Sequence, residues 1–153
     1  MTCLFELSIA LLITLLNGFF VMAEYSLVRI RKSRLDELIR QGKSRANTVL
    51  KMSEKLDTYL SATQLGITAS SLLLGWFGGP LLAEMFRGMF GVSAGTWYDH
   101  SLVFACAFLI IVFLHVVFGE LVPRTIALGK VEQVAMAVAY PLVFFHYLLY
   151  PLV

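Results

Sequence analysis

Four long apolar blocks constrain this chain more than any other feature of its sequence. They cover residues 4–28, 59–77, 101–122 and 131–153. A helix needs about 20 consecutive, mostly apolar residues to cross the hydrocarbon core of a bilayer. Apolar residues make up 59% of the chain and charged residues 14%, which excludes an ordinary soluble domain and a disordered chain. The sequence predicts an all-α polytopic membrane protein whose first three blocks span the bilayer.

The fourth block, 131–153, allows two interpretations. It is long enough to span, but Pro141 interrupts it and Pro151 lies near its end. Each proline removes a backbone hydrogen bond and strains a helix. From hydropathy alone, this block is either a fourth span or an interfacial or re-entrant helix pair.

The basic residues predict the orientation of the spans. Nine of the twelve lysines and arginines lie in 29–55, against three acidic residues. A basic block can bind nucleic acid, but this one lies between two apolar blocks, so we expect a cytoplasmic segment and no nucleic-acid partner. Residues 29–56 are then cytoplasmic, the N-terminus and the loop 78–100 are outside, and the membrane is the plasma (inner) membrane.

Within the basic segment, apolar residues recur at helical spacing over about 33–56, for example Leu35, Leu38, Val49 and Leu56. The opposite face is mostly charged. A solvated connector is the simplest alternative. The apolar stripe instead favours an amphipathic helix at the inner membrane surface, packed on lipid or on other helices.

The end of the third block carries the sharpest functional candidate, Glu120. Pro123 has no N–H, so the carbonyl of Gly119 loses its helical partner. A freed carbonyl beside a carboxylate offers two hard oxygen ligands, as in the broken helices of transporters. The alternative is a proline kink with Glu120 reaching cytoplasmic water or pairing with Arg124.

The second block presents a polar stripe, and it has two explanations. Gln64, Thr68, Ser71 and Gly75 are spaced so that they share one helix face. The hydroxyls could bind a cation, or the stripe could serve helix packing, which favours small and hydroxylated residues in membranes. We expect the helices of the second and third blocks to be broken at these polar sites.

Further polar candidates lie in the first and third blocks. Asn17 and Glu24 share a helix face, whereas Ser26 lies about 200° round from Glu24 at 100° per residue. Glu24 and Ser26 therefore cannot line one site in a regular helix. His115 lies one turn before Gly119 and serves either as a ligand or as a packing residue.

These candidates indicate the class of ligand. Carboxylate, hydroxyl and carbonyl oxygens suit Mg²⁺, Ca²⁺ or Na⁺ and do not suit soft metals. The chain has no phosphate-binding glycine loop and no His-Glu-x-x-His motif. We expect a protein that is not an enzyme.

Three segments resemble one known family. They are MAEYSL at 22–27, QLGIT at 64–68 and HVVFGELVPRT at 115–125. They resemble, in order and spacing, the three membrane helices of the CorC/cyclin M (CNNM) family of magnesium transporters. The resemblance extends along nearly all of the chain, and the third segment is the most specific.

The resemblance implies a transmembrane domain that exports Mg²⁺ in exchange for Na⁺. It implies a homodimer with three spanning helices per subunit and places 131–153 in juxtamembrane helices on the cytoplasmic side. Family members continue into a pair of cystathionine-β-synthase (CBS) domains that bind ATP. A CBS pair is therefore expected downstream of this chain.

The resemblance also implies a ligand set. Carried over by position, the cation ligands are Ser26, Thr68, Ser71, Gly119 and Glu120. Many members have Asn where this chain has Ser71, and a shorter side chain there could loosen the site or change the ion. Two other functions use the same residues: a Mg²⁺-sensing scaffold without transport, and a divalent cation channel that needs no Na⁺.

Overall fold

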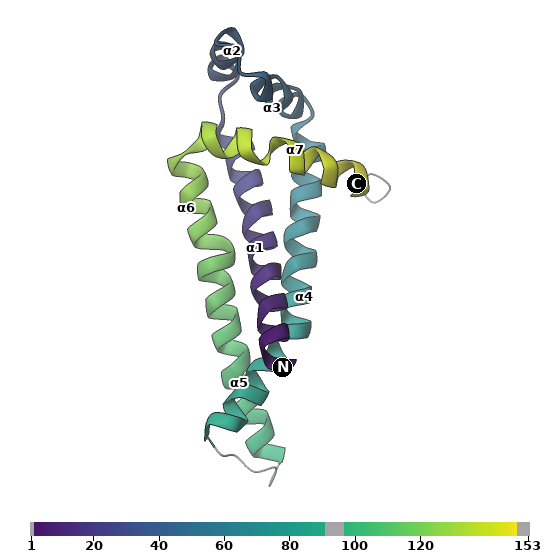
Figure 1. The fold of residues 1–153 in the computed structure, drawn as a ribbon, viewed down its shortest axis with the longest axis vertical. Helices are drawn as coiled ribbons and strands as arrows, with labels where there is room; N and C mark the ends of the chain where they lie inside the picture. The colour runs from purple at the N-terminus through teal and green to yellow at the C-terminus, as the bar shows by residue number, and fades with distance from the viewer. Residues whose placement is uncertain (1, 91–96, 150–153) are drawn as a thin grey trace.

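A computed structural model describes the backbone of residues 2–90 and 97–149, with side chains at 5–78, 105–106 and 108–148. All regular elements in these ranges are helices (Figure 1). Three helical rods stand side by side. They are α1 (Thr2–Arg29), α4 (Leu56–Phe90), and a continuous rod of α5 (Trp97–Leu114), the π-helix η1 (His115–Leu121) and α6 (Val122–Gly129).

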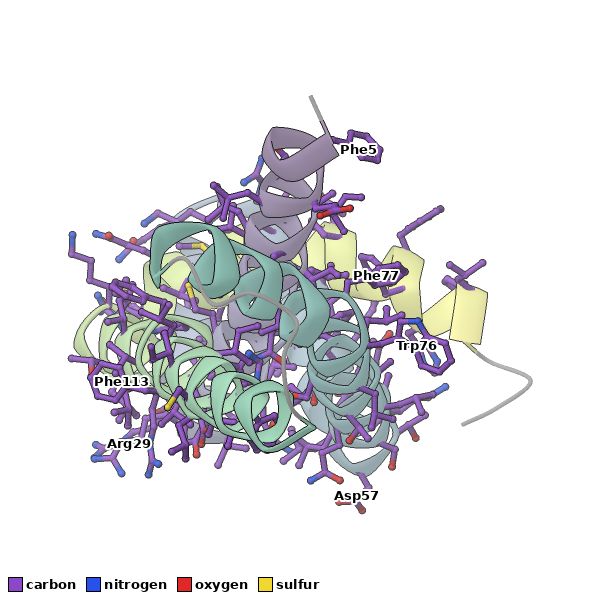
Figure 2. All side chains as sticks on the ribbon, turned by 90° about the horizontal axis from the view of Figure 1, so that it is seen from below. Phe5, Arg29, Asp57, Trp76, Phe77 and Phe113 are labelled. Carbon is purple, nitrogen blue, oxygen red and sulfur yellow. The ribbon has the colours of Figure 1, made fainter. Side chains whose placement is uncertain are left out.

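The described chain is built to lie in a membrane. Three of its segments are long and apolar enough to span one, namely Phe5–Arg29, Phe108–Gly129 and Val131–Leu148. The outer surface of the three rods stays apolar: Phe5, Trp76 and Phe113 are 67%, 79% and 66% exposed and point away from the rods in Figure 2. In water such a surface would be costly, whereas hydrocarbon solvates it well.

The second predicted span behaves differently from the first. Among the residues whose side chains are described, α4 contains no segment that passes as a span by hydropathy, and its polar stripe lowers the apolar character of 59–77 there. It nevertheless packs along the length of α1 (Figure 1). Its 35 residues reach about 50 Å at 1.5 Å per residue, more than the hydrocarbon core needs.

The predicted helix breaks and the external loop need correction. α4 runs without interruption through the polar stripe, so the break expected in 59–77 is wrong. The third helix does lose its α-helical hydrogen bonding at the predicted polar site, where it widens into η1, but it continues as a helix past Pro123 to Gly129. Most of the expected loop 78–100 is helical, since α4 ends at Phe90 and α5 begins at Trp97. Residues 91–96 lie outside the described residues.

The basic segment forms two helices instead of one. α2 (Lys32–Arg40) and α3 (Ser44–Glu54) are separated by a turn in which Gly42 has φ +80°, a conformation that side chains other than glycine disfavour. Their apolar faces lie in the protein core. These buried residues are Leu35, Leu38, Ala46, Val49 and Met52. The stripe read from the sequence is therefore a helix-packing face.

α7 (Val131–Leu149) lies across the ends of the three rods, at the end opposite the N-terminus (Figure 1). Pro141 lies inside α7 without ending it. Ala135, Val138 and Leu142 are buried in the core that α7 shares with α1, α2 and α3. Residues 150–153, including Pro151, lie outside the described residues.

An ion pair fixes α2 to the start of α7. Arg34 Nε donates a hydrogen bond to Glu132 Oε1 at 2.6 Å, and Arg34 also pairs with Glu37 on its own helix. Hydrogen bonds to Glu132 and Glu37 raise the pKa of Arg34 further above its ordinary value. The guanidinium therefore stays charged, and the link depends on the two carboxylates.

Candidate cation site

An open cleft of about 390 Å³ lies where α1, α4 and η1 meet. Four polar side chains line it together with Val21, Tyr25 and Ile67. The polar residues are Glu24, Gln64, Thr68 and Glu120. Each of the three predicted spans contributes at least one of these residues, so the cleft exists only once the rods have packed.

Two carboxylates face this cleft from different helices. Glu24 on α1 is half-buried and Glu120 on η1 is exposed, and like charges that line one cleft repel each other when both are ionised. The Gln64 amide of α4 interacts with the Glu24 carboxylate. Like charges brought together in this way are stabilised by a cation placed between them.

Arg124 is the basic residue closest to Glu120 along the chain, yet it does not neutralise it. Its guanidinium carbon lies 4.5 Å from the centre of the Tyr25 ring. Among the described residues, no ion pair involves Glu120. The alternative in which Glu120 simply pairs with Arg124 does not describe this structure.

Gly119, beside Glu120, is buried and held from α1. Asn17 Nδ2 donates a hydrogen bond of 2.9 Å to the Gly119 carbonyl oxygen. This is the carbonyl whose α-helical donor, four residues on, is missing because Pro123 has no N–H. Within η1 the backbone forms π-helical hydrogen bonds, for example from the N–H of Val122 to the carbonyl of Val117. A carbonyl oxygen has two lone pairs, so the Asn17 bond leaves one of them for another donor or a cation.

Gly18, next to Asn17, has no side chain and so allows Pro123 to approach α1 closely. A Cβ atom on Gly18 would lie 2.9 Å from Pro123 Cγ, closer than two carbons can approach. On α1, Asn17 therefore contacts the π-helical segment through a hydrogen bond. Gly18 lets Pro123 come close because it has no side chain.

Ser71 and His115, which do not line the cleft, form a second polar contact. Ser71 Oγ donates to the Ile67 carbonyl at 2.9 Å and lies 3.1 Å from His115 Nε2. With its proton used on Ile67, the hydroxyl accepts from the ring nitrogen. His115 Nδ1 and Asn17 Oδ1 are buried and have no hydrogen-bond partner among the described residues.

The predicted ligands therefore fall into three groups. Thr68 and Glu120 line the cleft, together with the additional candidates Glu24 and Gln64. Gly119, Ser71 and His115 do not line it and make the contacts with Asn17 and with each other described above. Ser26 is fully buried, donates to the Ala23 carbonyl at 3.2 Å, and does not line the cleft. The angular argument from the sequence is confirmed in one respect: the cleft takes Glu24 and leaves out Ser26.

Two residues of the site gained their roles only from the structure. Asn17 stood out as a polar residue in an apolar block, but its partner lies 102 residues away. Tyr25 carried no polar signal beyond its position next to Glu24. In both cases the sequence shows the residue but does not show which residue it contacts.

The donor set defines the kind of ion this cleft could hold. Within the described residues, no group of three or more His, Cys, Asp and Glu side chains converges on one point. The candidate ligands that line the cleft are two carboxylates, an amide and the Thr68 hydroxyl, which are hard oxygen donors. Such a set suits a partly hydrated divalent cation or Na⁺.

Fold and site together define a helical membrane domain with a polar cleft between its spans. The chain belongs to the cyclin M (CNNM) family: the model of the cyclin M transmembrane N-terminal domain matches residues 7–153. The expected resemblance is confirmed.

The chain also resembles several curated bacterial proteins. It is 41% identical over 139 residues to the UPF0053 protein YugS of Bacillus subtilis, covering 90% of this chain and 32% of that protein. It is 38% identical over 149 residues to the UPF0053 protein YrkA of the same organism, covering 97% and 34%. With the uncharacterized protein Rv1841c of Mycobacterium tuberculosis it shares 41% identity over 133 residues, covering 87% and 38%. The chain thus spans about a third of the length of these relatives.

Proposed function

We propose that this domain carries Mg²⁺ across the membrane, exporting it in exchange for Na⁺ entry, and that it is not an enzyme. The observation that carries the proposal is the meeting of Glu24 and Glu120 at one cleft between three packed helices. A charged side chain within a span is costly and marks an ion pathway by default. Membership of the cyclin M family makes Mg²⁺ the first ion to test.

In this proposal Mg²⁺ first meets the ligands of the open cleft. Glu120 and Glu24 supply negative charge, and Thr68 and Gln64 supply neutral oxygens. Mg²⁺ sheds its water reluctantly, and a half-open cleft lets it keep part of its hydration shell.

Deeper ligands would complete the coordination as the helices rearrange. The Ser26 and Ser71 hydroxyls each donate their proton to a carbonyl of their own helix. The Ser26 oxygen therefore keeps its lone pairs, and Ser71 keeps the one that His115 does not use, so both are chemically able to bind a cation. The second lone pair of the Gly119 carbonyl is available in the same way.

The orientation and the assembly are parts of the same proposal. Residues 29–56 and α7 lie at the cytoplasmic surface of the plasma membrane, and the N-terminus is outside. Two copies form a homodimer. Support for the dimer comes from Gln64, Thr68 and Glu120, which are exposed in the single chain and would be expensive to leave against lipid. A CBS pair that binds ATP, in the longer protein, would regulate transport.

The test is Mg²⁺ flux into liposomes that contain only this protein, with and without a Na⁺ gradient. We expect flux that depends on the Na⁺ gradient and is lost in Glu120→Gln. Glu6→Gln removes the same charge near the N-terminus of α1, away from the cleft, and should keep the flux. Flux that ignores Na⁺ would indicate a channel. Mg²⁺ binding without flux would indicate a sensor, and normal flux from Glu120→Gln would refute the site.

A further inference from the structure

We propose that Tyr25 is a positioning residue that holds Arg124 away from Glu120 and so keeps the carboxylate free for a cation. This inference rests on the proposed function. Arg124 is then an inhibitor within the chain itself: once released from Tyr25, it would compete with the cation for Glu120.

The first step of the argument concerns the position of Arg124. It follows Glu120 by four residues on the same continuous rod, since η1 passes directly into α6. Residues four apart on a helix are neighbours, and an acidic residue preceding a basic one by four is the favourable order for an ion pair. An unrestrained Arg124 is therefore well placed to pair with Glu120.

The second step concerns what Arg124 does instead. Its guanidinium carbon lies 4.5 Å from the centre of the Tyr25 ring, within the 6 Å or so at which a cation is attracted to an aromatic face. The two ion pairs found among the described residues both belong to Arg34, with Glu37 and Glu132. Tyr25 thus takes the partner that Glu120 would otherwise have.

The third step concerns the location of Tyr25. It lies on α1 next to Glu24 and forms part of the wall of the cleft. The stacking contact therefore joins α1 to α6 at the edge of the site. A movement of α6 relative to α1 that broke this contact would release a positive charge beside Glu120. The contact between Tyr25 and Arg124 therefore makes the net charge beside Glu120 depend on how α1 and α6 are packed.

The experiment compares four variants by Mg²⁺ titration of the purified full chain, followed by protection against thermal unfolding. Tyr25→Leu should weaken Mg²⁺ affinity about tenfold, the scale of a lost cation–π contact. Tyr25→Phe retains the aromatic face and should stay within about twofold of wild type. Adding Arg124→Gln to Tyr25→Leu should restore affinity, because the competing charge is gone.

The chain offers a matched control. Arg45 stacks on Tyr140, at 5.6 Å from the ring centre, with Tyr140 on α7. Neither residue lines the cleft. Tyr140→Leu removes the same kind of contact and should leave Mg²⁺ affinity at the wild-type value. Equal losses in Tyr25→Phe and Tyr25→Leu, or no recovery in the double variant, would overturn the inference.

A second readout keeps the inference testable if the proposed function fails. The proposed function is refuted if the wild-type protein binds no Mg²⁺, or if the Glu120→Gln variant binds Mg²⁺ normally. The movement of Arg124 from Tyr25 to Glu120 is then followed in the absence of metal, from the side-chain ¹⁵N NMR signal of Arg124. In Tyr25→Leu this signal should lose its ring-current shift and become sensitive to Glu120→Gln. If Glu120→Gln leaves the Arg124 signal of Tyr25→Leu unchanged, Arg124 does not move to Glu120 and the inference is wrong.

Discussion

Asn17 on α1 donates a 2.9 Å hydrogen bond to the carbonyl oxygen of Gly119 on η1. Pro123 cannot supply the α-helical donor four residues on, and the Asn17 side chain from another helix donates to this carbonyl. Asn17 is only 1% exposed, so water does not compete for this hydrogen bond. The bond ties the residue beside Glu120 to α1 and thereby fixes where the carboxylate meets the cleft.

We expect Asn17→Ala to destabilise the domain. The substitution removes the buried hydrogen bond that Asn17 donates to the Gly119 carbonyl, and losing one partner of a buried hydrogen bond costs roughly 1–3 kcal/mol. Thermal unfolding of detergent-solubilised protein measures the change. Thr14→Ala is the matched control on the same helix, since Thr14 Oγ1 only donates to the Ala10 carbonyl of α1 itself. Equal stability of the two variants would mean that Asn17 does not secure the distortion.

Gly66→Ala should weaken the packing of α4 on α1. A Cβ atom at Gly66 would lie 2.6 Å from three atoms of the Phe20 ring, and relieving such a clash costs roughly 1–3 kcal/mol. Gly75→Ala, also in α4, meets no atom within 4 Å and should be tolerated. Unfolding midpoints of the two variants provide the comparison. The prediction fails if Gly66→Ala unfolds at the same temperature as Gly75→Ala.

Glu24→Gln should lower Mg²⁺ affinity about tenfold, or about 1.4 kcal/mol, the scale of one charge interaction in a partly aqueous cleft. The reason is that Glu24 faces Glu120 across the site, and a divalent cation is attracted to both carboxylates. Isothermal titration with Mg²⁺ measures the effect, beside Glu6→Gln as a variant with the same change in charge. Unchanged affinity in Glu24→Gln would leave Glu120 as the single acidic ligand.

Cysteine labelling tests the proposed orientation. In a background with Cys3 and Cys106 replaced by serine, Lys43→Cys between α2 and α3 should react with an impermeant thiol reagent only after the cells are opened. Glu6→Cys, near the other end of α1, should react from outside. The same reagent applied to inverted vesicles should reverse the pattern. Labelling of Lys43→Cys on intact cells would place the basic segment outside and refute the orientation.

The sequence by itself determined the elements that follow from local composition. The first apolar block became α1 within two residues of its predicted ends, Thr2–Arg29 against 4–28, because an uninterrupted apolar run has few other stable forms in a membrane. The apolar stripe of the basic segment predicted a face packed on lipid or on other helices, and the structure buries it against other helices. Gly42 divided that segment into two helices, a conformational effect that helical spacing does not report.

For the polar site, the sequence determined which residues were candidates, and the tertiary structure decided how they are used. The prediction that Pro123 frees the Gly119 carbonyl rests on backbone chemistry within five residues, and it stays a prediction. That Asn17 then takes this carbonyl, that α4 stays continuous through its polar stripe, and that Arg124 stacks on Tyr25 were all decided by neighbours distant in sequence. A hydrogen bond or a stacking contact needs two partners at a set distance, and only the packing of the three rods brings these partners together.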